Sequence, residues 1–418
     1  MPPAEAATVP RPVGAAVGPA PALRLAIVAT HPIQYHAPLY RAIAATRDVD
    51  LTVYYAHRPS AAEQGIGFGV PFHWDDDLLS GYRSEWLRNV ADEQRARVGR
   101  PFADRYADYD APEIERIIGE QRFDVVLLHG WRVRSDWQTL RACRAHGVPV
   151  LVRGDSQLRD DAVPKRWLKR VLYPRLLRRF AACLSTGQRS EAYFRYYGAT
   201  RVVRSPHFVD NRLFADRASR ALRRREERRK AWGISPGDLV LLFAGKLVPR
   251  KRPLDLVHAA RGLSGVHILY AGDGALRESC EAWATRTGVA VTFAGFLNQS
   301  TMPEAYVAAD VLVLPSSERE TWGLVVNEAM ACGRPAIVSD AVGCAPDLIR
   351  DGETGYSYPA GDVAQLRTRI RQFLDARPDA ERLGAAARRH VEGQFTSEAA
   401  TAGVLHAARA AAGRGAWS

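Results

Sequence analysis

The stretch DVLVLPSSERETWGLVVNEAMACGRPAIVSD, from Asp310 to Asp340, contains the pattern of a strand, a loop, a helix and a second strand. Its run VLVL has the length and apolar character of a buried strand, and PAIVS has the same character. The intervening LVVNEAMA suits a helix that begins near Gly323 and ends by Gly333 and Pro335, because Gly and Pro mark helix ends. The stretch therefore predicts one unit of a parallel α/β sheet.

Apolar runs of this kind recur through both halves of the chain, with helical patterns between them. They start at Leu23, Asp50, Asp124, Val148 and Ala181 in the first half, and at Asp238, Val266, Val289, Asp310 and Arg334 in the second. Strand-like runs that alternate with helices indicate parallel sheets of the α/β class. The 418 residues therefore predict two doubly wound domains in series.

The chain divides into five expected segments. Residues 1–22 are rich in Ala and Pro and lack a continuous apolar core, which is typical of a disordered tail rather than a signal peptide. We expect an N-terminal domain over 23–205, a linker over 206–236, a C-terminal domain over 237–385 and a helical segment over 386–418 that packs back on the N-terminal domain. The charge run RRREERRK from Arg223 favours a solvated helix face within the linker.

Composition limits the partners and the compartment. The net charge of +12 and the pI near 9.7 favour an anionic partner, which can be nucleic acid, a phosphate-bearing molecule or an acidic membrane surface. None of the usual DNA- or RNA-binding modules is visible, so nucleic acid is not expected. Five cysteines without a C-x-x-C pair indicate free thiols in a reducing cytoplasm. No segment offers the roughly 20 apolar residues of a transmembrane helix.

The helix that starts near Gly323 is expected to bind an anion. Ligands of open α/β sheets lie beyond the carboxyl ends of the strands, and the amides and dipole of a helix N-terminus favour phosphate. Glu320 lies just before this helix and Glu328 lies inside it. Carboxylates beside phosphate can accept hydrogen bonds from sugar hydroxyls, which favours a nucleotide sugar as ligand. Taken alone, the two glutamates equally fit a helix-start charge and a surface residue.

The run from Pro315 to Asp340 resembles the E-x7-E signature of retaining glycosyltransferase family 4, and the match continues through GCAPDLI from Gly343 and DGETGY from Asp351. The resemblance implies the GT-B architecture, in which two Rossmann-like domains face each other across a cleft. It also implies transfer of a hexose-type sugar, with retention, from a nucleotide diphosphate donor. We expect a UDP-sugar in the first place and a GDP-sugar in the second.

The resemblance also assigns roles in the second half of the chain. Glu320 would face the donor sugar, and Glu328 would hold the ribose diol. The backbone amides expected to contact sugar and phosphate are those of Thr321, Trp322, Gly323 and Leu324.

The loop AGKLVPRKRP, from Ala244, resembles the family's G-R-L-x-x-x-K-G loop. Two cations on a turn can neutralise a diphosphate leaving group, a role that falls to Lys246 and Lys251, with Arg250 sharing that of Lys246. YAGDGALRE from Tyr270 and AGFLNQSTMPEAY from Ala294 resemble the segments that line the base pocket. They imply donor-binding roles for Gly272, Gly274 and Phe296.

The first half of the chain supplies the expected acceptor side of the cleft. ATHPIQYHAPLY, from Ala29, follows the first strand and places polar side chains at its carboxyl end. These side chains could grip an acceptor or the donor phosphates. By resemblance, His129 lies near the donor sugar. The expected acceptor or cleft residues are His31, Gln34, Tyr35, His36, Arg153 and Asp155.

Metal-dependent transferases of another fold use a D-x-D motif. Three such pairs occur in this chain, Asp48/Asp50, Asp75/Asp77 and Asp108/Asp110, but acidic triplets of this kind arise by chance. The phosphate-binding signals lie elsewhere. We therefore expect no obligatory metal and no cofactor besides the nucleotide sugar as co-substrate.

KRWLKRVLYPRLLRRF, from Lys165 to Phe180, interleaves basic and apolar residues at helical spacing, with an interruption at Pro174. It predicts peripheral contact with an anionic membrane and a lipid-linked acceptor, or else a core-packed helix with a basic outer face. A glycan, a glycolipid and a small molecule all stay open as acceptors, within cell-envelope polysaccharide biosynthesis. The alternatives to glycosyl transfer are a GT-B sugar-nucleotide epimerase and a basic protein that binds nucleic acid or a membrane surface.

Overall fold

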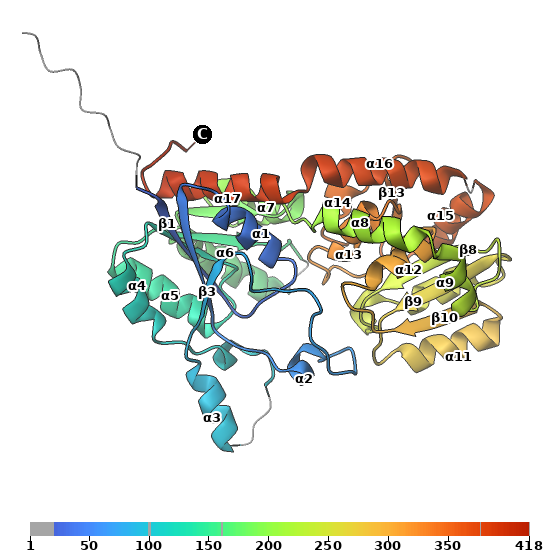
Figure 1. Ribbon diagram of the computed structural model, residues 1–418, viewed down its shortest axis with the longest axis horizontal. Helices are drawn as coiled ribbons and strands as arrows, with labels where there is room; N and C mark the ends of the chain where they lie inside the picture. Colours follow the sequence, from blue (N-terminus) through green and yellow to red (C-terminus); the bar gives the residue numbers. More distant parts are fainter. Residues whose placement is uncertain (1–20, 99–101, 160–161, 377, 418) are drawn as a thin grey trace, which may run out of the picture.

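The computed structural model of the chain describes residues 21–98, 102–159, 162–376 and 378–417. Two parallel sheets with their helices lie side by side along the longest axis (Figure 1). Alternate residues of the first strand enter different cores, Leu25 and Ile27 on one face and Ala26 and Val28 on the other. Both faces of this sheet are therefore covered, and the predicted pair of Rossmann-like α/β domains is confirmed. The tail expected over 1–22 lies outside the described residues up to residue 20.

The N-terminal domain is built on a seven-stranded parallel sheet in the order β3-β2-β1-β4-β5-β6-β7. Its strands are β1 (Leu23–Ala29), β2 (Val49–Tyr55), β3 (Arg83–Trp86), β4 (Val125–Leu128), β5 (Val150–Gly154), β6 (Ala182–Ser185) and β7 (Val202–Arg204). Its helices are α1 (Ala37–Ala44), α2 (Ala61–Gln64), α3 (Val90–Val98), the 3-10 helix η1 (Tyr106–Asp108), α4 (Ile114–Gln121), α5 (Arg134–Ala145), α6 (Val163–Leu177) and α7 (Gln188–Tyr196).

The C-terminal domain has a six-stranded parallel sheet in the order β10-β9-β8-β11-β12-β13. Its strands are β8 (Leu239–Ala244), β9 (Val266–Ala271), β10 (Ala290–Gly295), β11 (Val311–Leu314), β12 (Ala336–Ser339) and β13 (Gly355–Tyr358). The later helices are α8 (Asn211–Leu222), α9 (Arg225–Ala231), the 3-10 helix η2 (Pro249–Lys251), α10 (Leu254–Ala260), α11 (Arg277–Thr287), α12 (Met302–Ala308), α13 (Leu324–Ala331), α14 (Ala345–Leu348), α15 (Val363–Asp375), α16 (Pro378–Gln394) and α17 (Ser397–Ala411).

The stretch 206–236, expected as a linker, instead contains α8 and α9, which pack on α12 and α13 of the C-terminal domain. The expected solvated helix face is wrong for part of the charge run. Arg229 is buried, and its Nη2 lies 3.0 and 2.9 Å from the two carboxylate oxygens of Asp310. Arg225, one helical turn earlier, bonds the same carboxylate at 2.6 Å. These two arginines therefore fix α9 to the C-terminal domain.

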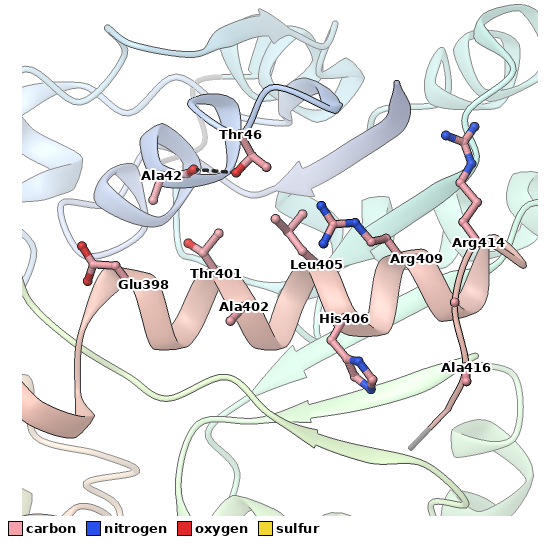
Figure 2. Close-up of a pocket in the computed structure, with 11 residues that line it drawn as sticks. Ala42, Thr46, Glu398, Thr401, Ala402, Leu405, His406, Arg409, Arg414 and Ala416 are labelled. Carbon is pink, nitrogen blue, oxygen red and sulfur yellow. Dashed lines mark hydrogen bonds between the residues drawn. The ribbon is translucent and has the colours of Figure 1, made fainter. Parts of the chain in front are cut away.

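The last helix, α17, returns to the N-terminal domain and packs on α1, β5, β6 and β7. In Figure 2, Thr401 and Leu405 lie on the side of α17 that faces α1. Arg409 adds an ion pair with Asp48 at 2.8 Å. The preceding α16 packs on α13 and α14. The chain therefore crosses between the domains after α16, and not at residue 386, where the C-terminal helical segment was expected to begin.

Helix α6 runs through Pro174, where the sequence indicates an interruption. Proline removes one N–H from the helix, but α6 ends at Leu177, so little of the helix remains beyond the missing bond. All five cysteines are free and buried, as expected. Within the described ranges, no helix has both the length and the apolar character needed to cross a bilayer.

Candidate active site

A cleft of about 820 Å³ lies between the carboxyl ends of the two sheets and is lined by both domains. Residues after β1, β4 and β5 form its N-terminal wall, and residues after β8 and β11 form its C-terminal wall. Most of the predicted site residues line it, namely His31, Gln34, Tyr35, His36, His129, Arg153, Asp155, Lys246, Lys251, Glu320, Thr321, Trp322, Gly323 and Leu324. The predicted residues outside this lining, within the described chain, are Arg250, Gly272, Gly274, Phe296 and Glu328.

Glu320 is held by two cations. Its Oε2 lies 2.7 Å from Nζ of Lys251 and 3.0 Å from Nη1 of Arg250. Lys251 belongs to η2 and is only 8% exposed, whereas Arg250 faces solvent. Because two cations share this one oxygen, attack through it would disturb both ion pairs. The cluster is better suited to accept or balance charge that a ligand brings.

The start of α13 opens on the cleft. Gly323 has a φ of +97°, and a Cβ there would come within 2.7 Å of a methyl group of Leu314. Glycine is therefore needed for the turn into the helix. Gly323, Leu324 and Val325 line the cleft, so the N-terminal amides of α13 are available to an anion. The indole of Trp322 is buried and donates a hydrogen bond to Asn327 at 2.8 Å. Only the main chain of Trp322 is therefore left to contact a ligand, as the sequence predicted.

Glu328 lies inside α13 and is 2% exposed. Its Oε1 accepts a hydrogen bond from the Tyr35 hydroxyl at 2.7 Å, and its Oε2 accepts one from the Tyr306 hydroxyl at 2.5 Å. Burial raises the pKa of Glu328, and these hydrogen bonds partly offset the effect. Both carboxylate oxygens of Glu328, the residue predicted to bind the ribose, thus already accept hydrogen bonds from the protein. Tyr306 ends the stretch AGFLNQSTMPEAY that resembles a base-pocket segment, but it was not named as a site residue, because no local pattern indicates a partner 22 residues away.

Gly272 and Gly274 are required by close backbone packing. Both have positive φ values. A Cβ on Gly272 would lie 2.1 Å from the carbonyl oxygen of Gly245, and one on Gly274 would lie 2.7 Å from that of Leu247. The lack of a side chain at these two positions therefore lets their loop pack closely against the segment that carries Lys246. The two glycines support the C-terminal wall but do not line the cleft.

Phe296 contacts the N-terminal domain. Its ring stacks on Phe72, with centroids 4.2 Å apart, and meets the edge of Phe68 at 5.0 Å. Both phenylalanines belong to the segment between β2 and β3, for which the sequence predicted no role. Its Gly-rich, aromatic stretch GIGFGVPFHW, from Gly65, is the signal that could have identified it.

The N-terminal wall carries a group of neutral histidines. Nε2 of His129 lies 2.9 Å from the Tyr40 hydroxyl, and the His129 ring stacks on His36 with centroids 4.1 Å apart. Burial, followed by the positive charge of Arg153, lowers the pKa of His129 to about 3. Burial also lowers the pKa of His31 to about 4 and that of His36 well below its ordinary value. Neutral imidazoles both donate and accept hydrogen bonds, which suits sugar hydroxyls.

Arg153 lies near the carboxyl end of β5 and is 3% exposed. Its Nη2 donates to the carbonyl oxygens of Ser205 and Pro206 at 3.2 and 3.0 Å. Burial lowers the pKa of Arg153 to about 10, so the guanidinium stays charged at neutral pH. It is a buried cation held mainly by carbonyl dipoles.

Asp155 joins the two walls. Its Oδ2 accepts a hydrogen bond from the Thr321 hydroxyl at 2.7 Å and lies 3.8 Å from Nε2 of His207. Burial raises the pKa of Asp155, but His207 and Thr321 outweigh it and lower that pKa to about 2. His207 lies in SPHFVD, a stretch that was predicted to be part of the linker. Its position just after β7 is the signal that points to the cleft.

The D-x-D pairs are engaged in protein contacts. Asp75 accepts hydrogen bonds from Ser300, Asp108 pairs with Arg95, and Asp110 pairs with Arg134. Over the part of the chain that the structure describes, no group of three His, Cys, Asp or Glu side chains is arranged to hold a metal ion.

Residues 224–390 match the family model of glycosyl transferases group 1. A D-inositol 3-phosphate glycosyltransferase of Geodermatophilus obscurus is 32% identical over 316 residues, which cover 69% of this chain and 67% of that protein. The sulfoquinovosyl transferase SQD2 of Arabidopsis thaliana is 34% identical over 187 residues, which cover 44% of this chain and only 35% of SQD2.

Two solved structures resemble the whole molecule. The structure of Anabaena HepE in complex with UDP and glucose has a TM-score of 0.67 at 17% identity and covers 92% of this chain and 98% of that one. The sucrose-phosphate synthase from Thermosynechococcus elongatus has a TM-score of 0.66 at 20% identity and covers 92% and 97%. At these identities the likeness concerns the fold, which is that of GT-B glycosyltransferases. The chain belongs to the glycosyl transferases group 1 family.

Proposed function

We propose that this protein is a retaining glycosyltransferase of family 4 that transfers a hexose-type sugar from a nucleotide diphosphate donor to a hydroxyl group. The observation that carries the proposal is the C-terminal wall, where the buried Lys251, the carboxylate of Glu320 and the amides at the start of α13 line one cleft. Amides and cations favour a diphosphate, and a carboxylate favours sugar hydroxyls.

The reaction is proposed to proceed by attack of the acceptor on the same face that the diphosphate leaves. The donor phosphate accepts the acceptor's proton, and Lys246 and Lys251 stabilise the negative charge that develops on the leaving group. This course needs no carboxylate nucleophile of the enzyme, and the ion pairs that hold Oε2 of Glu320 fit a role in balancing charge. Domain closure over the donor would exclude water.

The donor is proposed to be a UDP-sugar, with a GDP-sugar as the second candidate, and the reaction is proposed to need no metal. HepE, which shares the fold, was solved in complex with UDP and glucose, and this favours UDP as the first nucleotide to test. The acceptor is proposed to be a glycan, a glycolipid or a small molecule. D-inositol 3-phosphate, which the name of one relative specifies, belongs among the small molecules to test.

The test is a calorimetric titration with UDP, GDP and ADP, with and without EDTA, followed by an assay of sugar transfer. We expect one nucleotide to bind regardless of EDTA and the product to keep the anomeric configuration of the donor. Lys251→Ala should weaken that binding. Turnover of the donor sugar without any acceptor would favour a GT-B epimerase, and an inverted product would remove the retaining assignment.

We also propose that α6 contacts an anionic membrane on the cytoplasmic side and brings the enzyme to a lipid-linked acceptor. The outer face of α6 exposes Val163, Trp167, Leu168 and Leu172, with Trp167 at 66%. The chain between residues 162 and 180 carries seven Lys or Arg and no Asp or Glu. An exposed indole and leucines among cations fit the interface of an anionic bilayer.

Co-sedimentation with vesicles tests this contact. We expect binding to vesicles that contain phosphatidylglycerol and little binding to pure phosphatidylcholine. Trp167→Ser should reduce the bound fraction, whereas Tyr106→Ser, at another exposed aromatic of the same domain, should not. Equal binding by the wild type and Trp167→Ser would remove α6 from the proposal.

A further inference from the structure

The segment 65–77, here called the strap, leaves the N-terminal sheet after β2 and crosses to the C-terminal domain. The amide of Asn298 donates to the carbonyl oxygen of His73 at 2.7 Å. Arg217, on α8, pairs with Asp76 at 2.6 Å. These polar contacts anchor the far end of the strap beside β10 and α12.

The near end of the strap reaches two residues of the proposed donor site. Nζ of Lys246 donates to the carbonyl oxygen of Ile66 at 2.5 Å and lies 4.7 Å from the centroid of the Phe68 ring. The Phe72 ring covers Phe296 at a stacking distance of 4.2 Å and an interplanar angle of 29°. A nucleobase cannot enter between two rings at that distance, because a third ring would need about the same spacing again.

A third contact comes from the loop after β1. The Tyr35 hydroxyl donates to Oε1 of Glu328 at 2.7 Å, and Gln299 lies 3.4 Å from the same oxygen. Tyr35 belongs to the N-terminal domain and Glu328 to the C-terminal domain, so this hydrogen bond also spans the cleft. Because Glu328 is buried, water does not compete for the acceptor of this hydrogen bond.

We propose that these three groups of the N-terminal domain occupy the donor site in place of the nucleotide and leave it when the donor binds. Each of the three groups contacts a residue that is proposed to bind one part of the donor, and each resembles that part of the donor chemically. The Phe72 ring takes the place of the base on Phe296, the Tyr35 hydroxyl that of a ribose hydroxyl on Glu328, and the Ile66 carbonyl that of a phosphate oxygen on Lys246. This inference rests on the proposed function and on the donor-binding roles that the family resemblance implies for Phe296, Glu328 and Lys246.

The exchange has a thermodynamic consequence. A ligand that must first displace protein groups binds with its intrinsic affinity reduced by the fraction of molecules in which the site is open. If the site is open in about one molecule in ten, the measured Kd is about tenfold weaker than the intrinsic one. Weakening the self-contacts should therefore tighten nucleotide binding, which is the opposite of the usual effect of deleting residues at a binding site.

The experiment is a calorimetric titration of the full chain and its variants with UDP, GDP and ADP. Phe72→Ala removes the ring that covers Phe296, and Tyr35→Phe removes one hydroxyl while keeping the ring. We expect each variant to lower the Kd of the nucleotide that binds, by up to about tenfold. Tyr106→Ala, an exposed aromatic of the same domain, is the matched control and should leave the Kd unchanged. A thermal melt of each variant checks that it is folded.

Hydrogen–deuterium exchange of the wild type gives a second readout. We expect amides of residues 65–77 to exchange faster when the nucleotide is added, because the strap is released. A weaker Kd for Phe72→Ala, or slower exchange in the strap with nucleotide, would make the strap part of the donor site and overturn the inference. An unchanged Kd in both variants would overturn it while leaving the proposed function intact. If neither the wild type nor any variant bound a nucleotide, the proposed function itself would fail.

Discussion

The two walls of the cleft differ in the polar groups that they present, although the N-terminal wall also carries the charged Arg153 and Asp155. The C-terminal wall concentrates formal charge, with Lys251 and Arg250 on one oxygen of Glu320. The N-terminal wall gathers histidines that burial keeps neutral, His31, His36 and His129 among them. A pair of cations can respond when a leaving group becomes negative, whereas neutral imidazoles can donate hydrogen bonds to hydroxyl groups and accept hydrogen bonds from them. The difference suggests a division of labour between leaving-group stabilisation and sugar positioning.

Lys251→Ala should have the largest effect of the changes considered. It removes the most buried cation of the C-terminal wall, and loss of one preorganised donor of this kind lowers turnover by about 100- to 1000-fold. Measured kcat for sugar transfer checks this, with Arg250→Ala as the matched control at an exposed cation on the same carboxylate oxygen. Equal losses in the two variants would contradict the special role of the buried lysine.

Glu328→Ala should weaken nucleotide binding strongly and also destabilise the fold. The hydroxyls of Tyr35 and Tyr306 would lose their acceptor, and an unsatisfied buried polar group costs about 1–3 kcal/mol. Glu328→Gln keeps the shape and one acceptor oxygen, so it should be more stable than the alanine variant. Calorimetric Kd values and urea denaturation separate the two effects. Unchanged nucleotide affinity in Glu328→Ala would remove Glu328 from the donor site.

Asp155→Asn should have a moderate effect, because Asp155 is the carboxylate through which the N-terminal wall contacts Thr321 of the C-terminal wall. Loss of its charge weakens the hydrogen bond from Thr321 and the contact with His207, and a hydrogen bond to a charged group contributes about 1.5–3 kcal/mol. We expect a rise in KM of about tenfold. Thr321→Val removes the other partner of the same bond and is the control. Additive effects in the double variant would mean that the two residues act separately.

The free energy of unfolding should depend on pH because of the buried histidines of the N-terminal wall. The folded protein keeps His31 and His129 neutral, with pKa values of about 4 and 3, whereas the unfolded chain protonates histidines near pH 6.5. The unfolded state therefore binds more protons below pH 6.5, and stability falls as the pH drops from about 6.5 toward 4. Each such histidine contributes a slope of about 1.4 kcal/mol per pH unit.

Urea denaturation between pH 4.5 and 7.5 measures this slope. His129→Asn should flatten it, and His406→Asn, on α17 and outside the cleft, should not. A slope that is the same in the wild type and His129→Asn would contradict the neutral state of His129.

The sequence predicted the strands that lie inside the sheets and missed three at their edges. β3, β7 and β13 are the outer strands that no apolar run indicated. RSEW of β3 mixes charge with one aromatic, and VVR of β7 has only three residues. Edge strands are covered on fewer sides, so their sequences need less apolar character. Periodicity therefore detects burial rather than strand pairing.

The part of the C-terminal wall that contains Glu320 and the start of α13 was predictable because it is one continuous stretch, whereas Lys251 comes from η2 and was assigned by the family resemblance. Glu320 and the start of α13 are separated by a few residues, so a local pattern fixes their geometry. Contacts across the cleft have no such pattern. Tyr35 and Glu328 are 293 residues apart, and the stack of Phe72 on Phe296 depends on how the two domains meet. His207 was missed for the same reason, since its partner Asp155 lies on a different strand end.

The position of α17 has a consequence for the order of folding during synthesis. Val404 and Ala408 of this helix are fully buried in the same core as Leu25 and Ile27 of the first strand. The core around the first strand is therefore completed by a helix that is synthesised only after the whole C-terminal domain. At about 5–20 residues per second, the strands that α17 covers wait about ten to forty seconds for it. During that interval the apolar surface that α17 later covers is exposed on the nascent chain.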